Sequence, residues 1–171
     1  MKKFVCVYVI FFLFLVAPAW AEKNDVNLGF GVEGNMNSNK GWAFGRSISV
    51  DIHLFEYVIT GATLTISDDF KQFTAIEPAV FVRWHPPLTA IPFLKKAAFL
   101  DVKNGGFFIQ GDVGISTIIG FFDRNVTPKF LGGLTLGFRF PFQNGDYLVE
   151  PFIKSGYPFL FGVGVKFGCR F

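Results

Sequence analysis

The last fourteen residues of the chain, 158–171, read PFLFGVGVKFGCRF and alternate in character from one residue to the next. One set of alternate positions holds Phe159, Phe161, Val163, Val165, Phe167, Cys169 and Phe171. The positions between them hold Leu160, Gly162, Gly164, Lys166, Gly168 and Arg170. A period of two places each set on its own face of a β-strand. A glycine-rich face suits the crowded inside of a small barrel and a Phe/Val face suits lipid, so the stretch predicts a membrane strand.

The same alternation recurs in seven earlier segments. They are residues 26–34, 42–54, 57–67, 73–85, 106–119, 129–140 and 147–154. An even number of strands returns the chain to the side on which it started. The sequence therefore predicts an all-β fold, an eight-stranded antiparallel up-and-down transmembrane β-barrel with both termini in the periplasm. A lipocalin-like soluble barrel has the same strand number but would hold its bulky apolar residues inside around a ligand, so the membrane barrel is favoured.

The N-terminus has the composition of a cleaved signal peptide. Lys2 and Lys3 form a basic region, residues 4–16 are apolar, and Ala19-Trp20-Ala21 supplies a small-x-small cleavage site. We expect residues 1–21 to be removed and residues 22–171 to form the barrel. Removal of the two lysines leaves 14 Lys and Arg against 13 Asp and Glu, so the formal charge falls from +3 to +1. Such a balanced charge gives no support to nucleic-acid binding.

The cysteine and phenylalanine content agrees with this reading. Cys6 leaves with the signal peptide, so Cys169 stays alone and is expected to be a small apolar residue on the outward face. The 25 phenylalanines are too many for an ordinary core of this size, but they suit a wall that faces lipid.

Aromatic residues fall at the ends of the predicted strands in two separate rows. Along the predicted path, the periplasmic row is Tyr57, Trp84 and Tyr147, and the outer row is Trp42 and Tyr157. Such rows are typical of membrane strands at the two lipid–water interfaces. The predicted outer loops are residues 35–41, 67–72, 120–128 and 155–158.

Three features of the chain do not follow the simple pattern. Arg46 lies on an apolar parity, where it either snorkels near a loop or marks a bulge. Pro78 and Pro151 each follow a glutamate inside a predicted strand and remove a ladder donor. Residues 86–105 form a long connection on the periplasmic side, and residues 91–101 suit a short helix at the membrane surface. The alternative for that segment is a flexible loop whose apolar residues pack on the barrel end.

Charged residues occur repeatedly on the inward parity of the predicted strands. An eight-stranded barrel is just wide enough to be filled by side chains, and isolated charges there are costly to desolvate. We therefore expect a structural network of ion pairs that fills the lumen, in preference to a polar path for a small solute. The predicted network comprises Glu33, Asp51, Glu77, Arg83, Asp112, Arg139, Glu150, Lys166 and Arg170, with Lys154 on the same parity.

The C-terminal strand resembles that of the small outer-membrane β-barrel families, those of the OmpA membrane domain, OmpX, OmpW and PagL. The resemblance rests on Gly164, Phe167 and the terminal Phe171, while Cys169 stands where a larger apolar residue is commoner. It implies a bacterial outer-membrane, cell-surface location, contact with outer-membrane lipid, and recognition of this strand by the outer-membrane assembly machinery.

No catalytic, cofactor-binding or metal site is apparent in the sequence. PagL-like deacylases place His and Ser two residues apart, and neither His53 nor His85 has such a neighbour. Ser49, Asp51 and His53 share one strand face, but residues spaced in this way need not meet as a triad. We therefore expect a protein that is not an enzyme and has no cofactor.

The sequence favours a structural or surface-interaction role, in which the outer loops contact a host or surface ligand. The first alternative is an OmpW-like, porin-like conduit for small apolar solutes. The second is a barrel enzyme that modifies the acyl chains of lipid A.

Overall fold

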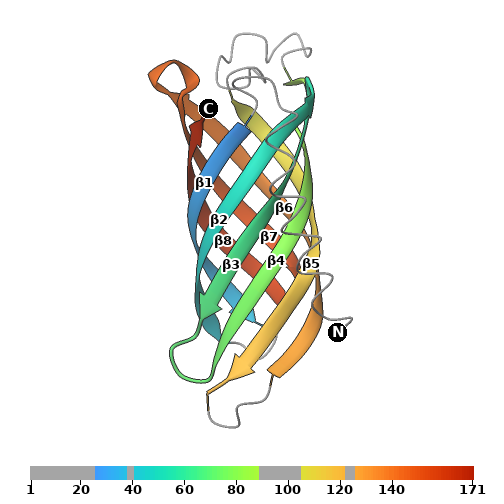
Figure 1. Ribbon diagram of the computed structural model, residues 1–171, viewed down its shortest axis with the longest axis vertical. Helices are drawn as coiled ribbons and strands as arrows, with labels where there is room; N and C mark the ends of the chain where they lie inside the picture. The colour runs from blue at the N-terminus through green and yellow to red at the C-terminus, as the bar shows by residue number, and fades with distance from the viewer. Residues whose placement is uncertain (1–25, 38–40, 89–104, 122–125) are drawn as a thin grey trace.

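The computed structural model describes residues 26–37, 41–88, 105–121 and 126–171, which form a closed barrel (Figure 1). Each strand pairs antiparallel with the next, and β1 also pairs with β8. The predicted eight-stranded antiparallel up-and-down barrel is confirmed. The strands are β1 (Val26–Asn37), β2 (Trp42–Phe55), β3 (Val58–Asp68), β4 (Phe73–Trp84), β5 (Gly106–Gly120), β6 (Val126–Phe142), β7 (Tyr147–Tyr157) and β8 (Phe159–Arg170).

The barrel has two distinct ends. Asn27 pairs with Arg170, so β1 begins where β8 finishes, and Figure 1 shows both at the same end. We call this the terminal end and the opposite one the loop end. In the described part of the chain, no helix is long and apolar enough to cross a membrane. The predicted signal peptide lies outside the described residues, as does the predicted helix at 91–101.

Alternation along the strands separates an outer face from a lumen. In β4, Val80 and Val82 are 51% and 57% exposed, whereas Ala79 and Phe81, at the alternate positions, are buried. Among the described residues, buried apolar side chains are fewer than buried polar ones, and a small apolar cluster of Ala43, Ala75 and Phe159 lies near the loop end. Most other buried side chains in the described residues are polar, so the barrel is held inside by hydrogen bonds and ion pairs more than by an apolar core.

The parity of β8 differs from the prediction at its first residues. Phe159, expected on the outward face, is buried in the lumen, and Leu160, expected inward, is 50% exposed. The cause is a register shift opposite residues 36–37, where Met36 pairs with Phe161 but the next residue pairs with Phe159. One extra residue in a strand reverses the faces of the residues beyond it.

Several loops are shorter than the sequence indicated. β5 runs to Gly120 and β6 begins at Val126, so the predicted loop at 120–128 is reduced to 121–125. Thr117 pairs with Pro128, a residue that indicated a loop in the sequence. The predicted turn at 155–158 is also largely strand. β7 there pairs with β6 up to Tyr157, after its pairing with β8 has stopped.

Arg46 lies in regular strand, which excludes the bulge as its explanation. Its pairing with Val32 and with Ile66 continues without a shift. The side chain points outward near the loop end, and its Nη2 atom lies 2.7 Å from Oδ2 of Asp68. Arg46 is 60% exposed, so this pair contributes little to stability.

The β3–β4 loop is organised by a single carboxylate. Asp69 Oδ1 accepts hydrogen bonds from the backbone N–H groups of Lys71, Gln72 and Phe73 at 3.0, 2.7 and 3.0 Å. Burial alone would raise the pKa of the Asp69 carboxyl, but these three donors outweigh that effect and lower it. A lowered pKa stabilises the folded loop above the ordinary aspartate pKa, and this stabilisation is lost as the pH falls through the folded value.

The structure accounts for both prolines inside strands. Pairing of β4 with β5 stops after Ile76 and resumes at Ala79, so Pro78 lies in an interruption of the β4–β5 ladder, while its pairing with Leu64 of β3 continues. The strands approach closely there, because a Cβ atom added to Gly114 would lie 2.2 Å from the Pro78 carbonyl oxygen. Pro151 in β7 repeats the interruption against β6. Each Glu-Pro pair thus directs a carboxylate into the lumen at a break in the ladder.

Candidate functional site

The charged residues predicted for the lumen all lie on the inward face of the barrel. Two of them, Asp112 and Arg170, are half-buried. The other seven are between 2% and 9% exposed, and these are Glu33, Asp51, Glu77, Arg83, Arg139, Glu150 and Lys166.

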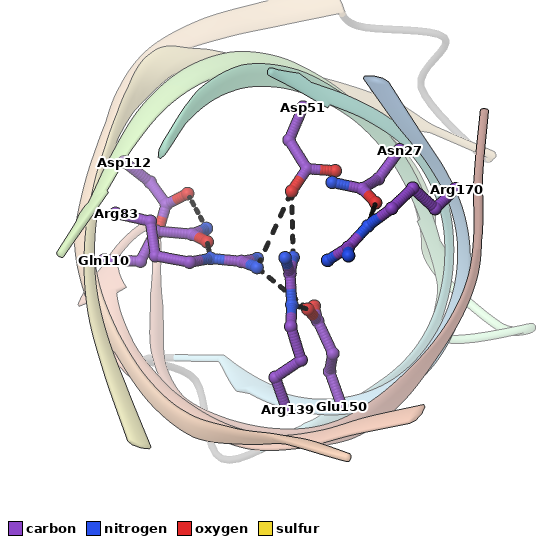
Figure 2. Close-up of polar contacts among 8 residues, drawn as sticks. All are labelled: Asn27, Asp51, Arg83, Gln110, Asp112, Arg139, Glu150 and Arg170. Carbon is purple, nitrogen blue, oxygen red and sulfur yellow. Dashed lines mark hydrogen bonds and ion pairs between the residues drawn. The ribbon is translucent and has the colours of Figure 1, made fainter. Parts of the chain in front are cut away.

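Four of these side chains form a network across the lumen, which we call the charge plug. It consists of Asp51 from β2, Arg83 from β4, Arg139 from β6 and Glu150 from β7 (Figure 2). Arg83 Nη1 lies 2.9 Å from Glu150 Oε1, and Arg139 Nη2 lies 2.9 Å from Asp51 Oδ2. Arg139 Nε also donates to Glu150, and Arg83 Nη1 lies 3.8 Å from Asp51 Oδ2. Two carboxylates and two guanidinium groups balance each other in charge.

Neighbouring side chains outside the plug hold it in position. Arg83 Nε donates to Gln110 Oε1 at 2.9 Å, and Gln110 Nε2 donates to Asp112 Oδ1 at 2.7 Å. Thr135 donates to the other Asp112 oxygen at 3.0 Å. The Arg83 guanidinium lies 4.2 Å from the centroid of the Phe108 ring, a favourable cation–π distance. Arg83 is therefore fixed on several sides, which suits a structural role.

A second network lies nearer the loop end and consists of Glu33, Asn35, Ser67, Glu77 and Lys154. We call it the acidic cup. Lys154 Nζ lies 2.5 Å from Glu33 Oε1, which also accepts a hydrogen bond from Asn35 Nδ2 at 2.7 Å. Asn35 Nδ2 donates in addition to Ser67 Oγ at 3.2 Å, and Ser67 donates to Glu77 Oε2 at 3.4 Å. The cup thus holds two carboxylates and one lysine.

The cup opens into a cavity of about 650 Å³, counting the part open to solvent. The cavity reaches the loop end at Tyr157 and Pro158, and its polar wall includes Glu77 and Lys154. Its apolar wall includes Leu131, Phe152 and Phe159. A separate cavity of about 230 Å³ is lined by Asp51, Arg139 and Glu150 of the plug and by residues of the terminal end. The plug therefore lies between two cavities.

The histidines lie toward the terminal end, and the structure shows no reason to assign them a reaction. His85 is buried, and its ring centroid lies 5.8 Å from that of Phe108. The Asp51 carboxylate, the acid of the triad considered from the sequence, lies within ion-pair distance of Arg83 and Arg139. In the described residues no group of three His, Cys, Asp or Glu side chains gathers as a metal site.

The predicted interface aromatics occupy opposite ends of the barrel. Trp42 and Tyr157 lie at the loop end and are 58% and 50% exposed. Trp84 and Tyr147 lie at the terminal end and are 47% and 50% exposed, and Tyr57 at the same end is half-buried.

The residues predicted as an assembly signal lie along β8. Phe167 and Phe171 are 54% and 59% exposed, and the Phe171 N–H donates to the Val26 carbonyl at 2.9 Å. Gly164 is on the inward face, where an added Cβ atom would lie 2.6 Å from Phe152 Cζ. A glycine is thus needed there for packing inside the barrel. The role of these residues in assembly stays a prediction.

The sequence reasoning missed the uncharged members of both networks. Asn27, Asn35, Ser67, Gln110 and Thr135 all lie on inward parities and are buried. Asn27 Oδ1 accepts from Arg170 Nε at 3.4 Å. The same period of two could have identified them, had neutral polar residues been considered as partners for the charges.

No protein-family model matches the chain, and no curated protein matches it. Among solved structures, Neisserial surface protein A (NspA) superposes with a TM-score of 0.64 at 7% identity, over 85% of this chain and 96% of that chain. The N-terminal β-barrel domain of Pseudomonas aeruginosa OprF superposes with a TM-score of 0.60 at 9% identity, over 87% of this chain and 98% of that chain. The predicted resemblance to small outer-membrane barrels is confirmed for the fold.

Proposed function

We propose that the protein is an integral outer-membrane β-barrel with a structural or surface-interaction role and a lumen that does not conduct. The observation that supports this most directly is the charge plug. Arg83 and Arg139 each lie within ion-pair distance of both Asp51 and Glu150, so four strands are joined across the lumen. Opening a path would require buried ion pairs to separate without water, which is costly.

The outer face supports the membrane location. Phe30, Phe130 and Leu134 are 64%, 64% and 61% exposed, and similar apolar side chains surround the wall. Monomeric soluble proteins rarely expose contiguous apolar surface of this kind. The exposed Trp and Tyr residues at both ends of the barrel fit two lipid–water interfaces.

The proposal includes the processing and partners of the chain. Residues 1–21 act as the signal peptide, and residues 22–171 form the mature barrel. The assembly machinery recognises β8 through outward side chains such as Phe167 and Phe171. The loop end, including residues 69–72, presents the surface that a host or surface ligand would contact.

One alternative role has an observation in its favour. The cavity at the loop end has apolar side chains in its wall, including Leu131, Phe152 and Phe159, as a conduit for small apolar solutes would need. The charge plug, on the terminal-end side of this cavity, opposes that role, because an apolar solute would have to pass between paired ions.

Planar-bilayer recordings test the closed lumen. Purified barrel, shown to be folded by a difference in gel mobility between boiled and unboiled samples, is expected to give no stable current steps. Reproducible channel openings by the folded protein would contradict the proposal.

The non-enzymatic role is tested by the mass of lipid A from cells that express the protein. That mass should be unchanged, and the loss or gain of an acyl chain would contradict the role.

A further inference from the structure

The two networks in the lumen differ in charge balance. The charge plug pairs two carboxylates with two guanidinium groups, whereas the acidic cup holds Glu33 and Glu77 with Lys154 alone. Asp112 and Lys166 also line the cavity, but they offset each other in formal charge. With all carboxyl groups ionised, the wall of the cavity therefore has an excess of one negative formal charge.

Glu77 is the carboxylate of the cup that lacks a cation. It is 2% exposed, and its Oε1 atom has no hydrogen-bond partner in the described part of the chain. Its Oε2 atom accepts a 3.4 Å hydrogen bond from Ser67, and the Ser116 hydroxyl lies close to the carboxylate. The next residue is Pro78, which has no N–H to donate. A buried carboxylate in this state is costly unless a partner completes it.

The other buried atoms without partners around the cup are also oxygens. Asn35 is fully buried, and its Oδ1 atom has no hydrogen-bond partner among the described residues. The same holds for the hydroxyl oxygen of Ser47. Carboxylate and amide oxygens can only accept, whereas a serine hydroxyl can donate or accept, so an occupant that donates hydrogen bonds suits Glu77 and Asn35.

We propose that the acidic cup binds a small organic ammonium ion, with Glu77 as its counter-ion. A primary ammonium group has three N–H donors and one positive charge, which matches the oxygens and the excess charge. The Phe152 and Phe159 side chains in the wall of the cavity suit the apolar part of such a ligand. The cavity opens at the loop end, so the ligand enters from that side.

Alternative occupants fit the site less well. An anion would be repelled by the excess negative charge. A divalent metal ion needs several strong ligands, and no group of three His, Cys, Asp or Glu side chains gathers in the part of the chain that is described. A lipid with several acyl chains is too large for the cavity, in which water-sized groups have about 70 Å³ of space, so the ligand is a small soluble amine.

Titration of the full mature barrel in detergent micelles tests the proposal, with backbone amide NMR shifts as the readout. The probe is n-butylammonium, and 1-butanol and butanoate serve as its neutral and anionic counterparts. We expect saturation only with n-butylammonium, with a dissociation constant of about 1 mM, as for a ligand of this size. Glu77→Gln should weaken this binding at least about tenfold, because it removes the counter-ion. Asp146→Asn, which changes an exposed carboxylate at the terminal end, should leave binding unchanged.

A second variant supplies the missing cation from the protein itself. Thr65 lines the cavity and pairs directly with Glu77 across β3 and β4. Thr65→Lys should abolish n-butylammonium binding and raise the unfolding midpoint of the barrel. Thr65→Met, which fills similar space without charge, should not raise the midpoint.

Four results would overturn the proposal. They are the absence of saturable n-butylammonium binding by the wild-type barrel, equal binding of 1-butanol, unchanged binding by folded Glu77→Gln, and unchanged binding by Thr65→Lys. The first would show that water or a proton alone completes Glu77. None of them would alter the closed lumen proposed above, because the charge plug contains neither Glu77 nor Thr65.

Discussion

Replacing Glu150 with glutamine is expected to lower the free energy of unfolding by about 3–5 kcal/mol. Glu150 accepts hydrogen bonds from both guanidinium groups of the charge plug, Arg83 and Arg139. All three side chains are almost fully buried. The variant keeps the shape of the side chain but leaves an excess positive charge inside the barrel, and Asp51 alone cannot balance two arginines.

Denaturant unfolding of the reconstituted barrel measures this change. Arg46→Gln is the matched control, because Arg46 belongs to an ion pair with Asp68 in which the arginine is 60% exposed. Removing that pair should cost no more than about 1 kcal/mol. A loss of similar size in the two variants would mean that the plug is neither buried nor tightly paired in solution.

Val113→Arg is expected to destabilise the barrel in lipid vesicles by about 2–4 kcal/mol, as a lipid-facing charge does near the bilayer midplane. Val113 lies in the middle of β5, faces outward and is 54% exposed. Val126→Arg is the control, because Val126 is 60% exposed but lies at the loop end of β6. There the same charge should cost about 0–1 kcal/mol.

The comparison of these two variants measures how the cost of an arginine depends on its depth in the bilayer, because both variants replace an exposed valine with arginine. In a soluble barrel both sites would face water, and neither change should matter much. Equal and small effects in vesicles would therefore contradict a lipid-facing wall.

The sequence predicted the strands well because side-chain alternation is local. In β4, for example, Phe81 and Arg83 are inward and Val82 is outward, as the period of two requires. The prediction was wrong at Phe159, where the parity depends on a register shift against β1. It was also wrong for the loop at 120–128, because Pro128 pairs within a strand that is longer than its apolar pattern.

The presence of charges in the lumen could be predicted, but their partners could not. Arg139 and Asp51 are 88 residues apart in the chain, and Lys154 and Glu33 are 121 apart. Which charges meet depends on the register and closure of the whole barrel, and no local pattern contains that information. The unpaired state of Glu77 follows from the same long-range geometry.

Depth-dependent quenching of tryptophan fluorescence tests the central claim, a barrel that spans a lipid bilayer, most directly. The chain has three tryptophans, and Trp20 belongs to the proposed signal peptide, so the mature protein retains Trp42 and Trp84. These are 58% and 47% exposed on the outward face, at opposite ends of the barrel. In vesicles with brominated lipids, we predict strong quenching that is greatest when bromine lies close to the headgroups. Fluorescence that is indifferent to brominated lipid would contradict the membrane-spanning barrel.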